Sequence, residues 1–299
     1  MEMISKLTTE MRNEKSKNLD QMTIDEILEL MNEEDKMVPD AVKAVLPEIG
    51  QAVAYVKEAL LNGGSVFYIG AGTSGRIGLL DAVECPPTFS TSADKVQAVL
   101  AGGEASLFKA IEGAEDNQNQ GVKDLEVRKV SKRDVVIGIA ASGRTPYVKG
   151  ALEYASFIGA KVVSLTSNKH SEISKYADVA IEVVTGPEVL TGSTRLKAAT
   201  AHKMILNMIS TASMIKFGKV YQNLMVDVNA SNYKLKERAK MIVSEATGVP
   251  YSEAEHVLEE TNYEVKPAIV KILTGTDPET AKSKLIQANG FVREAVNSN

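Results

Sequence analysis

The chain has 299 residues, of which 44% are hydrophobic and 24% charged, and its formal net charge is -5 at pH 7. Because single hydrophobic cores stop growing near this length, we expect one large domain and one smaller domain. Since the sequence has no concentrated basic face, we do not expect it to bind nucleic acid.

The sequence shows no membrane-spanning segment, no signal peptide and no pair of cysteines for a disulfide, and this indicates its cellular compartment. No window is long and apolar enough to span a bilayer, and residues 1–20 are polar with mixed charge, unlike a signal peptide. The one cysteine, Cys85, cannot form an internal disulfide, which is typical of a reducing compartment. We therefore expect a cytoplasmic protein without membrane association. Pro86 and Pro87 follow Cys85, and no basic residue is adjacent to it in the sequence. We therefore predict that Cys85 is a small buried side chain rather than a nucleophile.

The first predicted elements in chain order are helical. A polar arm precedes Thr23 and Glu26, which spell a capping box at the start of a helix. Apolar residues at helical spacing then predict a long helix over residues 40–61, which Pro47 kinks or splits and the sequence NGG ends.

An alternation of short apolar runs with helix-length segments follows. The runs that we interpret as strands are residues 65–69, 96–100, 134–140, 161–165 and 179–183. Helical patterns separate them, such as residues 147–157, and a long helix is expected over about residues 193–216. This alternation predicts an α/β fold, with a five-stranded parallel sheet flanked by helices on both faces.

The tail of the chain has no strand-like run. Short helical patterns occupy residues 244–247, 252–258, 265–273 and 278–286, with breaks at 248–250 and 274–277. We therefore divide the chain into a large α/β domain over residues 1–238, which includes the N-terminal helical arm, and a small helical bundle over residues 239–299.

Three turns rich in glycine and hydroxyl side chains carry the main chemical signal. They are residues 70–76 (GAGTSGR), 141–146 (ASGRTP) and 191–195 (TGSTR), and each precedes a predicted helix. Glycine lets the backbone approach a ligand, and a helix N-terminus at the carboxyl edge of a parallel sheet favours an anion. The alternative is that these Ser and Thr residues only cap helices. Three such turns in one sheet favour a site for a phosphate monoester.

Two nucleotide-binding interpretations of the first turn fail. The turn spells G-x-G-x-x-G after a strand, but a dinucleotide site also needs an acidic residue at the end of the second strand. That strand instead ends in the sequence LAGG, and Glu104 lies beyond it. The turn also lacks the lysine of a P-loop, so we do not expect nucleotide hydrolysis.

Two acidic segments supply candidate acid–base groups. Glu84 is expected at the C-terminal end of a helix that Pro86 and Pro87 stop, where the helix dipole favours the protonated carboxyl group and hence proton donation. A solvated helix-end charge is the alternative. The second segment, EGAEDN at residues 112–117, is an acidic loop or a helix cap by its local pattern, and spacing does not rank its three carboxylates.

No metal site is expected. The three histidines, His170, His202 and His256, have no metal-ligand spacing on one helix, and no H-E-x-x-H motif occurs. His202, on the long helix after the third turn, is a candidate catalytic base.

Several segments together are similar to those of one enzyme family. They are residues 70–89 (GAGTSGRIGLLDAVECPPTF), 112–117 (EGAEDN), 138–148 (GIAASGRTPYV), 189–197 (VLTGSTRLK) and 219–227 (KVYQNLMVD). On these segments the chain resembles the N-acetylmuramic acid 6-phosphate etherases over nearly its whole length. It departs from the family at Val83, Ser90, Ala199 and His202, and none of these removes a proposed catalytic group.

The resemblance implies a sugar isomerase-type (SIS) fold over residues 1–238, a tail similar to small ubiquitin-associated (UBA-like) domains, and a homodimer. It also implies cleavage of the D-lactyl ether of N-acetylmuramic acid 6-phosphate without a cofactor, giving N-acetylglucosamine 6-phosphate and D-lactate. The family's acid–base carboxylates fall on Glu84, as the proton donor, and on Glu115.

The implied reaction explains why such groups are needed. Once the sugar ring opens, a base removes the acidic C2 proton, an acid protonates the departing ether oxygen at C3, and water adds back to the double bond. We assign contacts with the phosphate and the sugar to Thr73, Ser74, Ser142, Thr145, Ser193 and Thr194, with Glu112, Arg76, Arg144 and Arg195 as further candidates.

Two other functions stay open. A sugar-phosphate aldose–ketose isomerase would share the fold, the anchor and the C2 proton abstraction, but it needs no acid for a C3 leaving group, so Glu84 favours the etherase. A non-catalytic sugar-phosphate sensor, like the glucokinase regulatory protein, would keep the hydroxyl-rich turns without needing both Glu84 and Glu115. The helical tail completes a dimer, covers the site or docks another protein.

Overall fold

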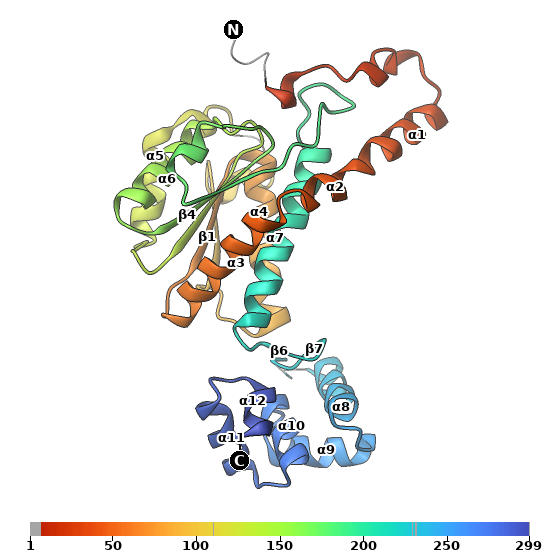
Figure 1. The fold of residues 1–299 in the computed structure, drawn as a ribbon, viewed down its shortest axis with the longest axis vertical. Helices are drawn as coiled ribbons and strands as arrows, with labels where there is room; N and C mark the ends of the chain where they lie inside the picture. Colours follow the sequence, from red (N-terminus) through yellow and green to blue (C-terminus); the bar gives the residue numbers. More distant parts are fainter. Residues whose placement is uncertain (1–6, 110, 229, 231, 299) are drawn as a thin grey trace. The chain divides into compact units, whose positions relative to one another are not determined.

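The structure, a computed structural model, describes residues 7–109, 111–228, 230 and 232–298. Contacts divide the described residues into two compact units, one within residues 7–83 and 94–210 and the other within residues 84–93 and 211–298. Figure 1 traces their elements in chain order. The first unit is α/β, and the second consists of helices and one short hairpin.

The N-terminal segment of the first unit is helical, as expected, although residues 1–6 of the polar arm lie outside the described residues. Three 3-10 turns, η1 (Thr8–Glu10), η2 (Glu14–Ser16) and η3 (Leu19–Gln21), precede helix α1 (Ile24–Asp35). The predicted capping box is present, since the Thr23 amide donates to Glu26 Oε2 at 2.7 Å and the Glu26 amide donates to Thr23 Oγ1 at 3.3 Å.

The predicted long helix that follows is split into two. They are α2 (Met37–Lys43) and α3 (Leu46–Leu61). Pro47 lies in the first turn of α3, where its missing amide proton costs no helical hydrogen bond. The prediction that this proline kinks or splits the helix is therefore confirmed.

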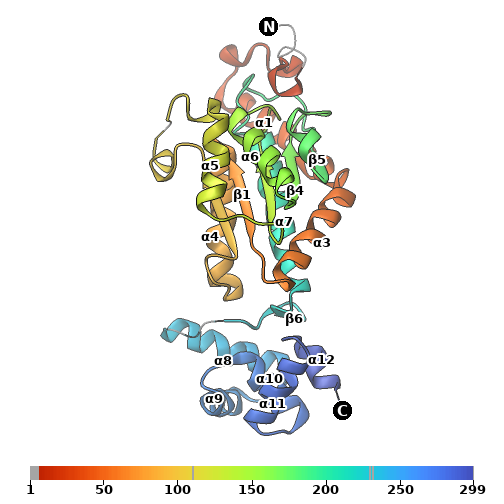
Figure 2. The same ribbon diagram turned by 90° about the vertical axis from the view of Figure 1, so that its left-hand side faces the viewer.

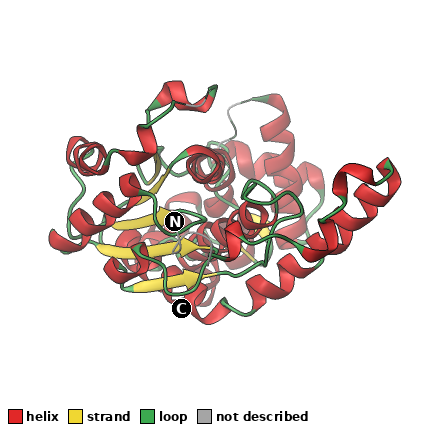
Figure 3. Cartoon of the chain, turned by 90° about the horizontal axis from the view of Figure 1, so that it is seen from above, coloured by secondary structure: helices red, strands yellow, loops and turns green. Residues whose placement is uncertain are grey.

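The five predicted strands form one sheet. They are β1 (Val66–Gly70), β2 (Val96–Leu100), β3 (Val135–Ile139), β4 (Lys161–Thr166) and β5 (Val179–Glu182). Neighbouring strands are parallel and their order is β2-β1-β3-β4-β5, so Val66 pairs with both Val96 and Val135. Figure 3 shows these strands side by side among the helices. The predicted α/β fold with a five-stranded parallel sheet is confirmed.

Helices cover both faces of this sheet. On one face lie α5 (Gln118–Val127) and α6 (Pro146–Phe157), and on the other lie α3, α4 (Gly72–Phe89) and α7 (Lys197–Lys216) (Figure 1). Figure 2 looks onto the face that α5 and α6 cover. Every residue of β1 and β3 is buried, as expected for strands covered on both sides. Gly138 of β3 makes room for α6, because a Cβ there would lie 2.7 Å from Leu152 Cδ1.

The predicted end of α4 is wrong. The helix does not stop before Pro86 and Pro87 but continues to Phe89. Each proline removes one hydrogen bond to the residue four positions earlier. Cys85 and Phe89 are buried on this last stretch, so packing offsets the lost bonds.

The second unit is a helical bundle with one hairpin. Strands β6 (Val220–Tyr221) and β7 (Leu224–Met225) pair antiparallel, and they precede α8 (Tyr233–Thr247), α9 (Tyr251–Glu260), α10 (Val265–Thr274), α11 (Pro278–Gln287) and α12 (Val292–Asn297). The predicted breaks are confirmed at Gly248 and Gly275, which end α8 and α10 with φ of 80° and 69°.

The helical pattern of the tail leaves some of this unit unpredicted. Helix α8 begins earlier than the pattern indicates, and α12, with 6 residues, is too short to show a helical period. At the centre of the bundle lies α10, where Ala268, Ile269 and Val270 are fully buried. None of the helices in the described ranges has both the length and the apolar character needed to cross a bilayer.

Candidate active site

The strand order creates one point where the chain connections diverge. From β1 the chain crosses to β2 on one side and later to β3 on the other, so Gly70 at the end of β1 pairs with both Leu100 and Ile139. In open parallel sheets, ligands bind at the carboxyl edge beside such a switch point. The segments that leave β1 and β3 at this edge are the first two hydroxyl-rich turns.

The first hydroxyl-rich turn connects β1 directly to α4. Helix α4 begins at Gly72, so Thr73 and Ser74 stand in its first turn, where backbone amides have no helical acceptor. Gly70 permits this close turn, since a Cβ there would lie 2.7 Å from the Gly75 amide nitrogen. Two half-buried hydroxyl groups and a helix N-terminus at the carboxyl edge of β1 suit an anionic ligand.

The second turn connects β3 to α6. Ser142 Oγ accepts a hydrogen bond from the Arg144 amide at 3.3 Å. Gly143 has a φ of 70°, and a Cβ there would lie 2.2 Å from Ser171 Cβ, so only glycine fits. Thr145 is the N-cap residue of α6, but its side chain accepts no capping hydrogen bond. Helix capping therefore does not account for the Thr145 hydroxyl group.

The third turn differs from the other two. Helix α7 begins at Lys197, not near residue 193 as predicted, because Glu188 caps it: the carboxylate accepts from the Lys197 amide at 3.0 Å and the Ala198 amide at 2.9 Å. Glu188 is 1% exposed, and burial raises its pKa although these two amides oppose the rise. A carboxylate of the protein itself thus occupies the N-terminus of α7. The helix N-terminus therefore adds nothing to anion binding at this turn. Ligand contacts at Ser193 and Thr194 stay a prediction, and they would be made by the side-chain hydroxyl groups alone.

A cavity of about 250 Å³ lies at the switch-point edge, between the first turn and the segment that follows β2. Its charged lining residues are Arg76, Lys109, Glu112 and Glu115. Two cations and two carboxylates that converge on one cavity are the arrangement expected for acid–base chemistry on an anionic substrate. Of the residues that the sequence singled out, the described lining contains Arg76, Glu112 and Glu115, and none of the six hydroxyl residues.

The wall of this cavity is held in place by Arg76. The guanidinium group donates to the carbonyl oxygens of Ser106 at 2.7 Å and Leu107 at 3.3 Å. These bonds fix the short 3-10 helix η4 (Glu104–Leu107) against α4. Glu115 lies in the next such turn, η5 (Ala114–Asp116), and its side chain is exposed to the cavity and solvent.

Glu84 lies on α4, but not where the sequence pattern predicts. Because α4 continues through Pro86 and Pro87, Glu84 is not at a helix C-terminus, and the dipole argument for proton donation is wrong. The side chain is exposed and belongs, with residues 84–93, to the second compact unit. A role for Glu84 as the acid depends on the family resemblance and stays a prediction.

His202 and Cys85 are buried. His202 is 1% exposed, its Nε2 lies 3.0 Å from Ser167 Oγ, and burial lowers its pKa to about 4. His202 is enclosed and does not line the cavity at the switch point, so the structure gives no support to a catalytic base at this position, and that role stays a prediction. Cys85 is buried, as predicted. Within the described ranges, no three His, Cys, Asp or Glu side chains gather as a metal ion would require.

Asp81 is a buried carboxylate that the sequence analysis does not single out. It accepts hydrogen bonds from the Tyr68 hydroxyl of β1 at 2.8 Å and the Ser210 hydroxyl of α7 at 2.9 Å, so it joins α4 to both elements. Burial raises its pKa, and the two hydroxyl groups oppose the rise. Its spacing from Gly78 and Cys85, three residues before and four after it, places it on the buried face of α4 and could have identified it.

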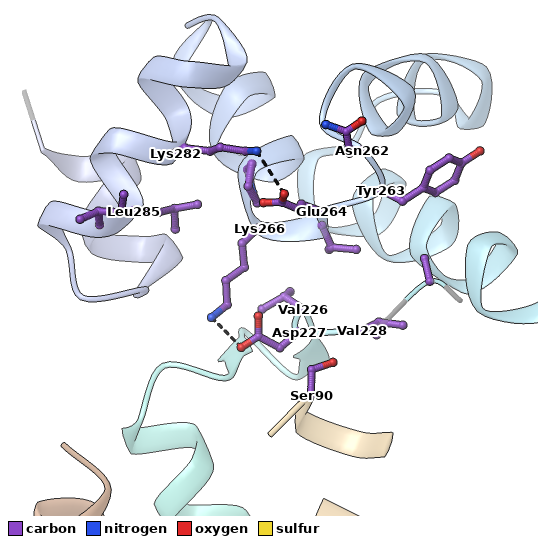
Figure 4. A pocket seen from close by; sticks show the side chains of 14 residues that line it. Ser90, Val226, Asp227, Val228, Asn262, Tyr263, Glu264, Lys266, Lys282 and Leu285 are labelled. Carbon is purple, nitrogen blue, oxygen red and sulfur yellow. Dashed lines mark hydrogen bonds and ion pairs between the residues drawn. The ribbon is translucent and has the colours of Figure 1, made fainter. Parts of the chain in front are cut away.

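A larger cavity, of about 500 Å³, lies within the second unit (Figure 4). Asp227 Oδ2 lies 2.9 Å from Lys266 Nζ and 2.8 Å from Lys219 Nζ, and burial lowers the pKa of Lys266. Lys282 Nζ donates to Glu264 Oε1 at 3.1 Å. These charges pair with each other, and no predicted site residue is among the described lining, so the smaller cavity is the better candidate for chemistry.

The fold and the site together define an α/β domain of the SIS type. The chain matches the SIS domain over residues 117–212 and the glucokinase regulatory protein N-terminal SIS domain over residues 48–156. Its fold is similar to that of a phosphoheptose isomerase from Neisseria gonorrhoeae. That similarity has a TM-score of 0.51 and 21% sequence identity, and it covers 63% of this chain and 98% of the isomerase chain.

Sequence similarity to named proteins identifies one family within the SIS class. The chain is 56% identical over 293 residues to N-acetylmuramic acid 6-phosphate etherase 1 of Bacillus licheniformis, covering 98% of this chain and 96% of that protein. It is 58% identical over 294 residues to the N-acetylmuramic acid 6-phosphate etherase of Geobacillus thermodenitrificans, covering 98% and 100%. The chain belongs to the N-acetylmuramic acid 6-phosphate etherase family, which the sequence motifs indicated.

Proposed function

We propose that this chain cleaves the D-lactyl ether of N-acetylmuramic acid 6-phosphate and releases N-acetylglucosamine 6-phosphate and D-lactate. The observation that carries the proposal is identity of 56% and 58% to etherases over nearly the full length of both chains. The cavity at the switch point supports it, because it gathers carboxylates and cations where an anionic sugar would bind.

The reaction is an elimination followed by an addition. In the open-chain sugar, the C1 aldehyde makes the C2 proton acidic. Removal of this proton forms a double bond between C2 and C3 as the C3–O bond breaks, and D-lactate leaves once its oxygen is protonated. Water then adds a hydroxyl group to C3 and a proton to C2, so the net change is hydrolysis without an oxidant or a reductant.

Two carboxylates are proposed for the proton transfers. Glu115, which lines the cavity, takes the C2 proton, and Glu84 donates a proton to the departing ether oxygen. General acid–base assistance of this kind is typically worth about 10²–10⁴-fold in rate.

The substrate is held by its phosphate in this proposal. Thr73 and Ser74 at the start of α4, and Ser142 and Thr145 before α6, present hydroxyl groups at the carboxyl edges of two neighbouring strands. A phosphate fixed there would bring C2 and C3 to the acid–base groups, which lowers the entropic part of the barrier. Ser193 and Thr194 are proposed as further contacts.

We also propose a cytoplasmic homodimer in which residues 239–299 form a separate, UBA-like domain that completes the dimer or covers the site. Val226 and Val228, which precede this boundary, pack in the same apolar cluster as α8 to α12. A chain that ends at residue 238 should therefore expose apolar surface. Its mass in solution and its activity test the proposal, and full activity in a stable dimer would refute the covering role.

The first test of the activity is an assay for D-lactate. The purified protein is incubated with N-acetylmuramic acid 6-phosphate in chelator-treated buffer without nucleotide, and we expect stoichiometric D-lactate. Tight binding of the substrate without lactate would instead indicate a sensor. Interconversion of aldose and ketose phosphates without lactate would indicate an isomerase.

A further inference from the structure

The cavity at the switch point contains two cations whose function the proposed proton transfers do not explain. Arg76 uses Nε and Nη2 to hold the carbonyl oxygens of η4, so part of its guanidinium group is committed to the wall. Lys109 also lines the cavity, and it makes no hydrogen bond or ion pair with any residue in the described ranges. Among the described residues, Lys109 is therefore a cation without a partner in the lining of the cavity that Glu112 and Glu115 also border.

The proposed substrate carries two anionic groups. One is the phosphate on C6, and the other is the carboxylate of the lactyl group, three bonds from C3. If Glu115 removes the C2 proton, the substituent on the neighbouring carbon C3 also lies in or beside this cavity. Glu112 and Glu115 would repel the lactyl carboxylate unless a cation stood between them.

We propose that Lys109, beside Arg76, binds the carboxylate of the lactyl group, and so selects the 3-O-lactyl sugar over sugar phosphates without an acidic substituent. The inference rests on the proposed function, since it names a contact within the same site. An ammonium group on a flexible side chain suits this role, because it meets the carboxylate without adding a proton-transfer group. Hydrogen bonds between charged partners are roughly twice as strong as neutral ones.

The proposed contact between Lys109 and the lactyl carboxylate is present both in the bound substrate and in the transition state, so it should affect substrate affinity. An interaction equal in the ground state and the transition state changes KM and leaves kcat nearly unchanged. Because the Lys109 side chain is exposed, solvent screening limits the effect, and we expect a change of about 10-fold.

The test uses two substrates and three variants of the full chain. The substrates are N-acetylmuramic acid 6-phosphate and its lactyl carboxamide, which has nearly the same shape but no negative charge. The variants are Lys109→Met, which removes the charge, Lys109→Arg, which retains it, and Lys123→Met as a matched control. Lys123 is an exposed lysine on α5 that does not line the cavity.

We expect Lys109→Met to raise KM for the acid substrate about 10-fold with little change in kcat, and to change KM for the carboxamide by less than about 2-fold. Lys109→Arg should retain most of the affinity, and Lys123→Met should match the wild type on both substrates. Equal losses on the acid and the carboxamide would overturn the inference while leaving the proposed function intact. A wild-type protein that releases no lactate would overturn the proposed function, and this inference with it.

Discussion

Lys197, the first residue of α7, forms a buried ion pair with Glu34 of α1, with Nζ 2.6 Å from Oε2. The two side chains are 1% and 5% exposed. Burial alone would raise the pKa of Glu34, but hydrogen bonds from Lys197, Lys15 and Asn13 outweigh it and lower the pKa to about 2. The pair joins the N-terminal helices to the residues that follow the third hydroxyl-rich turn.

Removal of one partner of this pair should destabilise the protein. In Lys197→Met, the Glu34 carboxylate stays buried without its closest cation, and breaking a buried pair typically costs about 3–5 kcal/mol. Denaturant unfolding measures the loss. Lys36→Met is the control, since Lys36 is 62% exposed and pairs with Glu33 at the surface, where such pairs are worth about 0–1 kcal/mol. Equal losses in the two variants would contradict the prediction.

His202 should make the protein less stable in mild acid. Its pKa is lowered from 6.5 to about 4, mainly by burial, so between these pH values the unfolded chain binds a proton that the folded chain does not. The free energy of unfolding should therefore fall as the pH decreases from about 7 to 4. At about 1.4 kcal/mol per pH unit, the loss approaches about 3 kcal/mol.

The variant His202→Gln tests this assignment. A glutamine amide can hydrogen-bond to Ser167, as the imidazole does, but it does not titrate. The free energy of unfolding of the variant, measured by denaturant titration at several pH values, should vary less between pH 7 and 4. Glu34, whose stabilising contribution is lost only as the pH falls from 4.5 towards 2, titrates in a lower range. An unchanged slope would show that another group is responsible.

Substitution of the two proposed catalytic carboxylates should block different steps of the reaction. Glu84→Gln removes the acid, so lactate release should fall by about 10²–10⁴-fold while exchange of the C2 proton with solvent deuterium continues. Glu115→Gln removes the base, so both should be lost. Release of D-lactate and mass spectrometry of the recovered substrate measure the two steps. Asp116→Asn, next to Glu115 in η5 but outside the cavity lining, should behave like the wild type. Wild-type turnover in Glu84→Gln would rule out its role.

The first two turns should anchor the phosphate group. Ser74→Ala and Thr145→Ala each remove a hydroxyl group at a helix start and should weaken the binding of N-acetylglucosamine 6-phosphate about 10-fold, measured by calorimetry. Thr200→Ala is the control, because that hydroxyl group already donates to the Leu196 carbonyl oxygen on the exposed side of α7. If unphosphorylated N-acetylglucosamine loses as much affinity as the phosphate ester, these hydroxyl groups contact the sugar instead.

Local sequence patterns predicted the presence of helices and strands better than the residues at which these elements end. The strands could be found because a buried parallel strand is a short apolar run, and all five predicted runs overlap a strand. The capping box at Thr23 and the glycine breaks at Gly248 and Gly275 were predictable because their hydrogen bonds and φ angles depend on a few adjacent residues. The end of α4 was not, because burial of Cys85 and Phe89 overrides the local effect of two prolines.

The candidate site, like the fold, was predictable from the sequence only in part. The sequence alone identified the family through its motifs and supplied the candidate site residues, which are the hydroxyl-rich turns and the segment with Glu112 and Glu115. Only the tertiary structure decided which of them meet. The pairing of Gly70 with both Leu100 and Ile139 brings three distant segments to one edge, and the Glu188 carboxylate closes the N-terminus of α7 to other anions. Strand order and burial depend on contacts between residues far apart in the chain, and no local pattern encodes them.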